Sequence, residues 1–121
     1  MKNYKELKIW EKGIEIVKLT YQLAKQFPQE EKYGIISQMT RAAVSIPANI
    51  AEGSSRNSEK DYVRFLEIAM GSAFELQTYY EIAKEMNWTK LDDLNNADTI
   101  LLEEIKMIFS FINKIRAANN W

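Results

Sequence analysis

Four stretches of the chain repeat apolar residues at spacings of three and four, which is the pattern of a helix that buries one face. Pro28 ends the first stretch, because the residue before a proline avoids helical geometry, and Ser58 suits the N-cap of the third. The predicted helices cover residues 4–27, 32–52, 59–86 and 91–118. Long helices joined by short connections predict one all-α domain over residues 1–121, an up-down-up-down four-helix bundle.

The second predicted helix contains a proline, Pro47. It removes a backbone donor, leaves the Ala43 carbonyl without its usual partner and should kink the helix. Gly53 is a natural helix stop. The motif around the proline comprises Ser45, Pro47, Asn49, Glu52 and Gly53. We expect its polar side chains to satisfy backbone groups at the kink and in the following turn; the alternative is a polar site that lines the channel of a ring.

The second and fourth helices each have a single apolar stripe, and their opposite faces are polar or small. These stripes are Ile36, Met39, Ala43, Ile46 and Ile50, and then Leu94, Leu101, Ile105, Ile108, Ile112 and Ile115. Each is expected to face the core of the bundle.

The first and third helices have apolar residues on two faces. We assign to the core Leu7, Trp10, Ile14, Val17, Tyr21 and Ala24 of the first helix, and Tyr62, Phe65, Ala69, Ser72, Leu76, Tyr79, Ala83 and Met86 of the third. The opposite faces carry Ile9, Ile16, Leu19 and Leu23, and Val63, Met70, Gly71 and Phe74. Exposed apolar patches usually mark contacts, so these eight residues are predicted to form a subunit interface, one that can close into a ring. The alternative is that the assignment is one position out of phase and they cover the edge of the core.

The amino-acid composition limits which catalytic sites, metal sites and binding partners are expected. The chain has 121 residues with no cysteine and no histidine, which removes disulfides, thiolate metal sites and the commonest general base. Lysine and arginine number 16 and aspartate and glutamate 17, for a net charge of −1, whereas dedicated nucleic-acid-binding domains are more often basic. No run is apolar enough to span a membrane and the first residues do not resemble a secretory signal, so a cytoplasmic protein is expected. We predict no catalytic residue, cofactor or metal ion.

Four basic residues lie around the turn between the second and third helices: Arg41, Arg56, Lys60 and Arg64. They could contact phosphates, which supply most non-specific affinity for nucleic acids. The alternative is a solvated face whose charges pair with neighbouring acids such as Asp61 and Glu67.

Other polar and aromatic residues favour structural roles. The acids Glu67, Glu75, Glu81 and Glu85 are interpreted as surface residues, because a di-iron centre of the usual kind needs histidine. Trp10, Tyr79, Tyr80 and Trp88 could stack on bases, but at bundle spacing they are more often core or interface anchors.

The chain resembles the four-helix-bundle proteins encoded within intervening sequences of bacterial 23S rRNA genes, over nearly its whole length. The residues that carry the resemblance are Ser45-Ile46-Pro47-Ala48-Asn49-Ile50-Ala51-Glu52-Gly53, then Ser58, Phe65-Leu66, Ile68-Ala69, Gly71-Ser72 and Glu75-Leu76. That family is also distantly similar to the accessory variability protein of diversity-generating retroelements, a basic pentameric barrel that binds nucleic acid. The present chain departs from that protein in its charge, and Gln77 and Tyr62 stand where an acid and a phenylalanine are expected.

The resemblance implies a small non-enzymatic bundle of unknown function that forms a homo-oligomer, typically a five-fold ring. The function expected from the sequence is therefore a self-associating bundle, with binding to structured RNA or DNA as a further possibility at the basic residues. The alternative is a protein–protein adaptor that binds no nucleic acid and whose partner the sequence does not name. An enzyme is not expected, because nothing in the sequence places a nucleophile beside a base.

Overall fold

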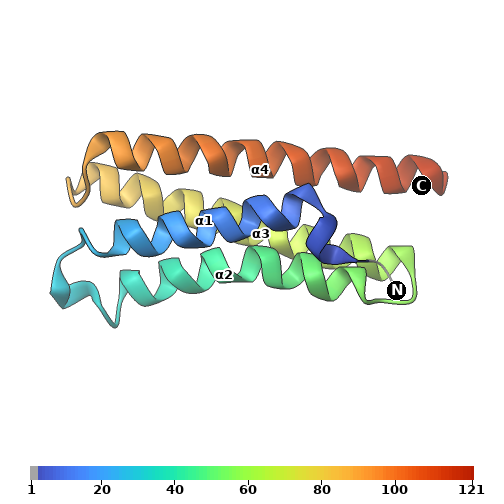
Figure 1. Cartoon of the computed structure of the whole chain (residues 1–121), viewed down its shortest axis with the longest axis horizontal. Coiled ribbons are helices and arrows are strands. Elements are labelled where there is room, and N and C mark those ends of the chain that lie inside the picture. Colours follow the sequence, from blue (N-terminus) through green and yellow to red (C-terminus); the bar gives the residue numbers. More distant parts are fainter. Residues whose placement is uncertain (1–2) are drawn as a thin grey trace.

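The computed structural model describes residues 3–121 and is built almost entirely of helices. A 3₁₀ turn, η1 (Tyr4–Glu6), precedes α1 (Lys8–Ala24), and η2 (Gln29–Glu31) lies between α1 and α2 (Ile35–Ser54). Two longer helices follow, α3 (Glu59–Glu85) and α4 (Leu91–Ala118). Figure 1 shows the four α-helices side by side along one axis, with both chain termini at the end where α2 turns into α3.

Consecutive helices pack against one another, and α1 and α4 close the ring of four contacts, so the predicted four-helix bundle is confirmed. In residues 3–121 no helix combines the length and hydrophobicity that crossing a bilayer requires.

Local signals explain both ends of α3. The Ser58 side chain accepts a hydrogen bond from the Asp61 backbone N–H at 3.1 Å, which confirms the predicted cap of α3. Asn87, with a φ of 57°, ends that helix in the left-handed region, and Trp88 N–H donates to the Ala83 carbonyl at 3.0 Å.

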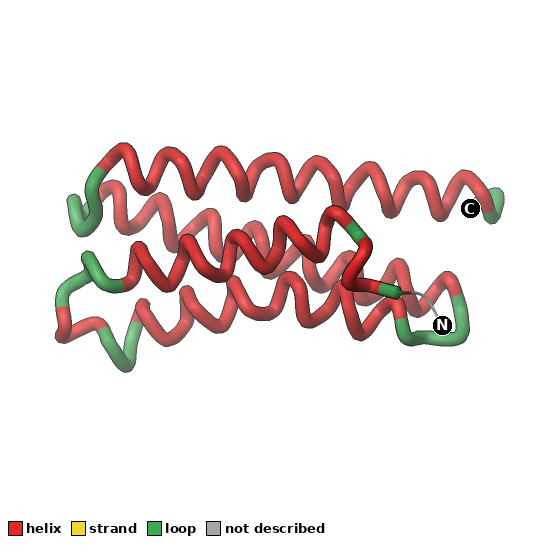
Figure 2. The backbone as a smooth tube through the Cα atoms, in the orientation of Figure 1, coloured by secondary structure: helices red, strands yellow, loops and turns green. Residues whose placement is uncertain are grey.

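Both bounds of the first two predicted helices differ from the structure. The first was expected to end at 27 but α1 ends at Ala24, and the second was expected to begin at 32 but α2 begins at Ile35. The first helix was expected over 4–27, but the chain is extended at Leu7, between η1 and α1, where Figure 2 shows a short loop. The second was expected to stop at Gly53, but α2 continues to Ser54 and Gly53 is not in the left-handed region. A Cβ at Gly53 would lie only 2.8 Å from Cβ of Phe65, so this glycine permits the close approach of α2 and α3.

The core contains most of the predicted stripes of α2, α3 and α4. The buried members of those stripes are Met39, Ala43, Ile46 and Ile50 in α2; Tyr62, Phe65, Ala69, Leu76 and Ala83 in α3; and Leu94, Leu101, Ile108, Ile112 and Ile115 in α4. Ile36, Ser72, Tyr79 and Ile105 are half-buried, while Met86 is exposed.

The predicted phase of the first helix is wrong. The core face of α1 is formed by Ile9, Gly13, Ile16, Thr20 and Leu23, all buried, whereas the predicted stripe lies on its flanks and Tyr21 is 51% exposed. Both sets of residues have helical spacing, but Gly13 lets α1 approach Pro47 of α2 closely, because the position of a Cβ on Gly13 lies 3.2 Å from Cβ of the proline.

The same burial corrects part of the predicted interface. Ile9, Ile16 and Leu23 of α1 and Val63 of α3 belong to the core of one chain, so they are not left in water as the two-face argument required. Leu19 and Met70 are half-buried against that core, while Gly71 and Phe74 are exposed. Of the eight predicted interface residues, four keep surface that another molecule could contact: Leu19, Met70, Gly71 and Phe74. For these four the interface stays a prediction.

Candidate functional site

The turn between α2 and α3 brings together three of the four predicted basic residues. Arg56 follows α2, and Lys60 and Arg64 stand in the first two turns of α3. The guanidinium groups of Arg56 and Arg64 lie 4.7 and 4.8 Å from the centre of the Phe65 ring, within the range of cation–π attraction. We call Arg56, Lys60 and Arg64 the basic rim.

Acidic residues lie within the basic rim. Arg56 Nη2 is 2.6 Å from Glu52 Oε2, and Arg64 Nε is 3.6 Å from Asp61 Oδ1. These are exposed pairs of the kind that add little stability, but they cancel much of the positive field that a phosphate would meet. The predicted alternative, a solvated face with neighbouring acids, therefore describes Arg56 and Arg64 well.

The end of α4 completes this surface from far away in the sequence. The Lys60 ammonium lies 5.5 Å from the centre of the Trp121 ring, and Arg116 Nη2 is 2.9 Å from Glu67 Oε2. Sequence reasoning missed Trp121 and Arg116, because nothing local predicts how the end of α4 aligns with the start of α3.

Arg41 does not belong to the basic rim. It lies in the first half of α2 and is exposed. At 1.5 Å per residue it is about 22 Å from Arg56 along the helix axis. A single phosphate group cannot be shared between them.

The proline motif forms a polar connection between α2 and α3. The Asn49 amide donates to the Ser45 carbonyl at 2.8 Å and to the Ser45 hydroxyl at 2.9 Å. That hydroxyl lies 2.8 Å from the hydroxyl of Ser72 on α3. Asn49 thus satisfies a backbone group beside Pro47, as predicted, whereas the Glu52 carboxylate binds Arg56 instead.

A buried acid lies at the centre of the bundle. None of the surface of Glu104 is exposed, and neither of its carboxyl oxygens has a hydrogen-bond partner among the described residues. One of them, Oε2, lies 3.2 Å from the position that a Cβ on Gly13 would take, on the side where Pro47 also contacts that position. Burial raises the pKa of Glu104 to about 8, against the opposing effect of the nearby Lys12 charge, which lowers it.

Glu104 is not among the predicted site residues, although its position in the sequence carries a signal. Glu104 falls three residues after Leu101 and four before Ile108, within the apolar stripe of α4. Its exposed neighbour Glu103 instead forms a 2.8 Å ion pair with Lys12 across the α1–α4 interface.

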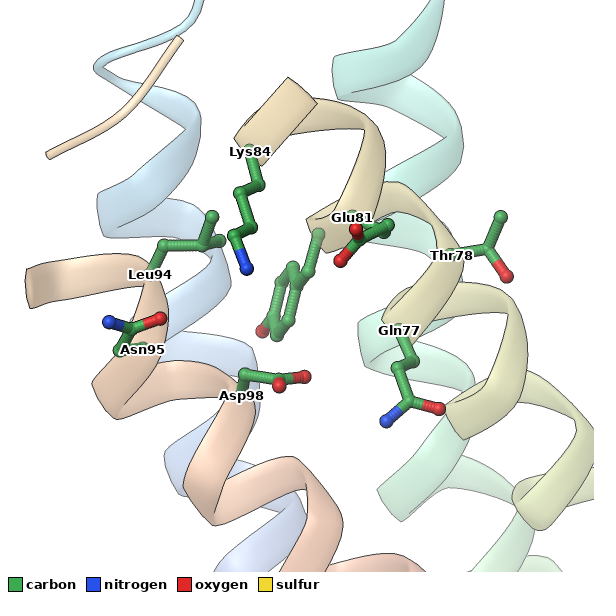
Figure 3. Close-up of a pocket in the computed structure, with 8 residues that line it drawn as sticks. Gln77, Thr78, Glu81, Lys84, Leu94, Asn95 and Asp98 are labelled. Atoms are coloured by element: carbon green, nitrogen blue, oxygen red, sulfur yellow. The ribbon is translucent and has the colours of Figure 1, made fainter. Parts of the chain in front are cut away.

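A polar cleft of about 390 Å³ lies between α3 and α4 near the turn that joins them. Figure 3 shows Asp98 and Asn95 of α4 facing Gln77, Glu81 and Lys84 of α3 across this space. Burial and the Glu81 charge raise the pKa of Asp98, while a hydrogen bond from Gln77 and the Lys84 charge lower it.

Tyr80 also lines this cleft, and its hydroxyl is held by Thr20 of α1 at 2.7 Å. Burial raises the pKa of Tyr80 to about 12, so the hydroxyl stays neutral at ordinary pH. The cleft thus offers carboxylates, an amine and amides to a small polar group. Among residues 3–121, no set of three or more acids is placed to hold a metal ion.

The outer face of α3 carries apolar residues without a covering element. Phe74 is 51% exposed and Ile68 is 43% exposed. Gly71 lies between them, three residues from each, and a Cβ added to it would meet nothing within 4 Å. A protruding ring therefore lies beside a gap in the side-chain surface. We call Ile68, Gly71 and Phe74 the outer apolar face.

Comparison with known proteins gives the family. The model of the 23S rRNA-intervening sequence protein family matches residues 5–110. Among solved structures, the chain is similar to a protein of unknown function from the S23 ribosomal protein family of Bacteroides thetaiotaomicron VPI-5482. The two share 25% identity and a TM-score of 0.79, over 86% of this chain and 97% of the other. No curated protein matches the chain. Neither comparison bears on the distant similarity to the retroelement accessory protein, which stays a prediction. The agreement of sequence, length and fold shows that the chain belongs to the 23S rRNA-intervening sequence protein family.

Proposed function

We propose that this protein is a non-enzymatic bundle that acts by assembling with copies of itself through α3. The observation that carries the proposal is the outer apolar face, where the half-exposed Phe74 ring stands beside the open position at Gly71. Burying apolar surface at about 25 cal/mol per Å² is the main driving force of association. When two helices pack, a protruding side chain of one fits into a space between side chains of the other. The Phe74 ring and the open position at Gly71 provide one feature of each kind.

The expected assembly is a closed ring. The family resemblance implies five subunits, and a ring forms when one patch on each subunit contacts a different patch on the next. Met70 and Leu19 are half-buried and retain some surface for such a contact. In this proposal the core residues of each chain contact only other residues of the same chain. The contacts between subunits are formed by side chains that are exposed on the surface of the bundle.

Solution mass tests the proposal. We expect the wild-type protein to elute and scatter light at about five times the 14.1 kDa mass of one chain. The Phe74→Glu variant should shift to the mass of a single chain with its helical circular dichroism unchanged, because a charge at the interface costs several kcal/mol to bury while costing little on an exposed helix.

A matched control separates the interface from general surface chemistry. Tyr33→Glu makes a comparable change at a side chain that is 88% exposed in the connection before α2. It should leave the mass of the assembly unchanged. A Phe74→Glu variant that unfolds would place Phe74 in the core, and one that keeps the full mass would remove α3 from the interface.

A second candidate function is binding of structured RNA or DNA at the basic rim. The observation in its favour is the position of two guanidinium groups over Phe65, which restricts Arg56 and Arg64 before any ligand arrives. The ion pairs with Glu52 and Asp61 and the net charge of −1 weigh against it. We therefore rank it below self-assembly.

The salt dependence of nucleic-acid binding distinguishes this candidate function from that of a protein–protein adaptor. Binding of labelled structured RNA or duplex DNA through phosphates must weaken steeply as salt rises, because each contact releases counterions. Arg56→Ala with Lys60→Ala should reduce both the affinity and the salt dependence. Lys25→Ala with Lys32→Ala removes the same charge at the opposite end of the bundle and serves as the control. No binding at low salt would leave the adaptor as the alternative to a purely self-associating protein.

A further inference from the structure

The centre of the bundle brings three unusual residues to one point. Gly13 of α1, Pro47 of α2 and Glu104 of α4 meet where a single Cβ added to the glycine would lie 3.2 Å from both a carboxyl oxygen and the proline ring. Glu104 is wholly buried there and its carboxyl oxygens have no hydrogen-bond partner within residues 3–121.

We propose that Glu104 makes the packing of α4 on α1 depend on a proton: as a neutral acid it holds α4 against α1, beside Pro47 of α2, and its ionisation loosens this α1–α4 crossing. An ionised carboxylate in an apolar interior without hydrogen-bond donors loses its hydration, and for Glu104 the attraction of the Lys12 charge offsets only part of that loss. The neutral acid is far less costly to bury. The side of the carboxyl group that faces α1 is closely packed, since a Cβ on Gly13 would lie 3.2 Å from Oε2 of Glu104.

The surroundings of Glu104 offer little to stabilise the charge. From α1 it faces Lys12, whose ammonium is already bound to Glu103 and lies near Glu15. The inward face of α2 carries no ionisable group, and that of α3 carries only Tyr62 and Tyr80. Burial raises the pKa of both tyrosines to about 12, so they stay neutral when Glu104 titrates.

The direction of the pH effect follows from linkage. The pKa of Glu104 is about 8 in the folded chain against an ordinary value of 4.5, so the folded state holds a proton that the unfolded state has lost. The contribution to stability is complete below the unfolded pKa and is lost as pH rises toward the folded pKa. Within that window each pH unit should lower the folding equilibrium constant about tenfold. Above about pH 8 the carboxylate is ionised in both states and the effect levels off.

The experiment compares the wild-type protein with Glu104→Gln, which keeps the size of the side chain and removes its charge. Urea unfolding of both is measured at each pH unit from 5 to 9, with Glu85→Gln as the control, because Glu85 is an exposed acid at the end of α3. The wild type and the control should lose stability steeply with rising pH relative to Glu104→Gln, about tenfold in the equilibrium constant per unit up to pH 8.

Nuclear magnetic resonance of the wild-type protein supplies a reading that needs no variant to fold. The side-chain carboxyl carbon of Glu104 and the amide of Gly13 should titrate together near pH 8. A carboxyl that titrates between pH 4 and 5, or a Glu104→Gln variant whose stability follows the same pH curve as the wild type, would overturn the proposal. A Gly13 amide that does not respond when Glu104 titrates would overturn the loosening of the crossing.

Discussion

Two glycines offer a direct test of how closely the helices pack. A Cβ at Gly53 would lie 2.8 Å from Cβ of Phe65 and 3.0 Å from a ring carbon of Tyr62, on the α3 side of the α2–α3 crossing. Carbon atoms prefer about 3.5–4.0 Å. Neither contact is with the end of a flexible side chain, so Gly53→Ala must move one helix away from the other.

The magnitude follows from two opposing effects. Overpacking a core typically costs about 1–3 kcal/mol, while replacing glycine by alanine inside a helix gains about 1 kcal/mol. The overpacking should win, and we expect Gly53→Ala to lower the free energy of unfolding by about 1 kcal/mol. At Gly71, where the added Cβ meets nothing within 4 Å, only the helix propensity operates. Gly71→Ala should therefore raise the free energy of unfolding by about 0.5–1 kcal/mol.

The assay is urea unfolding followed by circular dichroism, at protein concentrations low enough to keep each variant monomeric. Both variants make the same chemical change in a helical backbone, so the difference between them, about 2 kcal/mol, reports packing alone. The reasoning fails if Gly53→Ala is as stable as Gly71→Ala. Loss of assembly in Gly71→Ala without loss of stability would add support for an interface on α3.

Three further predictions concern the core, the buried acid and the basic rim. Leu76 is wholly buried, so Leu76→Ala should lower the free energy of unfolding by about 2–5 kcal/mol, and an unchanged urea midpoint would show that it is not a core residue. Between pH 5 and 8 the wild type should lose about 1.4 kcal/mol of unfolding free energy per pH unit relative to Glu104→Gln, or about 4 kcal/mol in total; parallel stability curves would contradict this. If the rim binds nucleic acid, Arg56→Ala with Lys60→Ala should reduce the slope of log affinity against log salt by about two, and an unchanged slope in a titration with labelled RNA would exclude these side chains.

The fold follows from periodicity wherever a helix has one apolar face. The stripes of α2 and α4 are unambiguous, so their positions and most of their core residues could be read from the sequence. Helix α1 offers two stripes with the same spacing, one through Trp10 and Val17 and one through Ile9 and Ile16. Periodicity cannot choose between them. The choice is made by Gly13, which allows a neighbouring helix to come close on only one side.

The candidate sites show two different limits of sequence reasoning. Helix length alone could have separated Arg41 from Arg56, because the rise per residue is fixed. The contact of Lys60 with Trp121 could not have been predicted, since it depends on the alignment of two helices distant in sequence. Glu104 is an intermediate case, because two signals in the sequence disagree. Its spacing within the apolar stripe predicts a buried position, whereas its residue type predicts an exposed one, since acids are almost never fully buried.

The measurement that tests the central claim most directly is the solution mass of the wild-type protein by sedimentation, over a range of concentrations and at low and high salt. Assembly through an apolar face predicts one species at several times the 14.1 kDa mass of the chain, retained at high salt because burial of apolar surface is not screened. A single species at 14.1 kDa at every concentration and salt would contradict the account. The exposed Phe74 and Gly71 would then need another explanation.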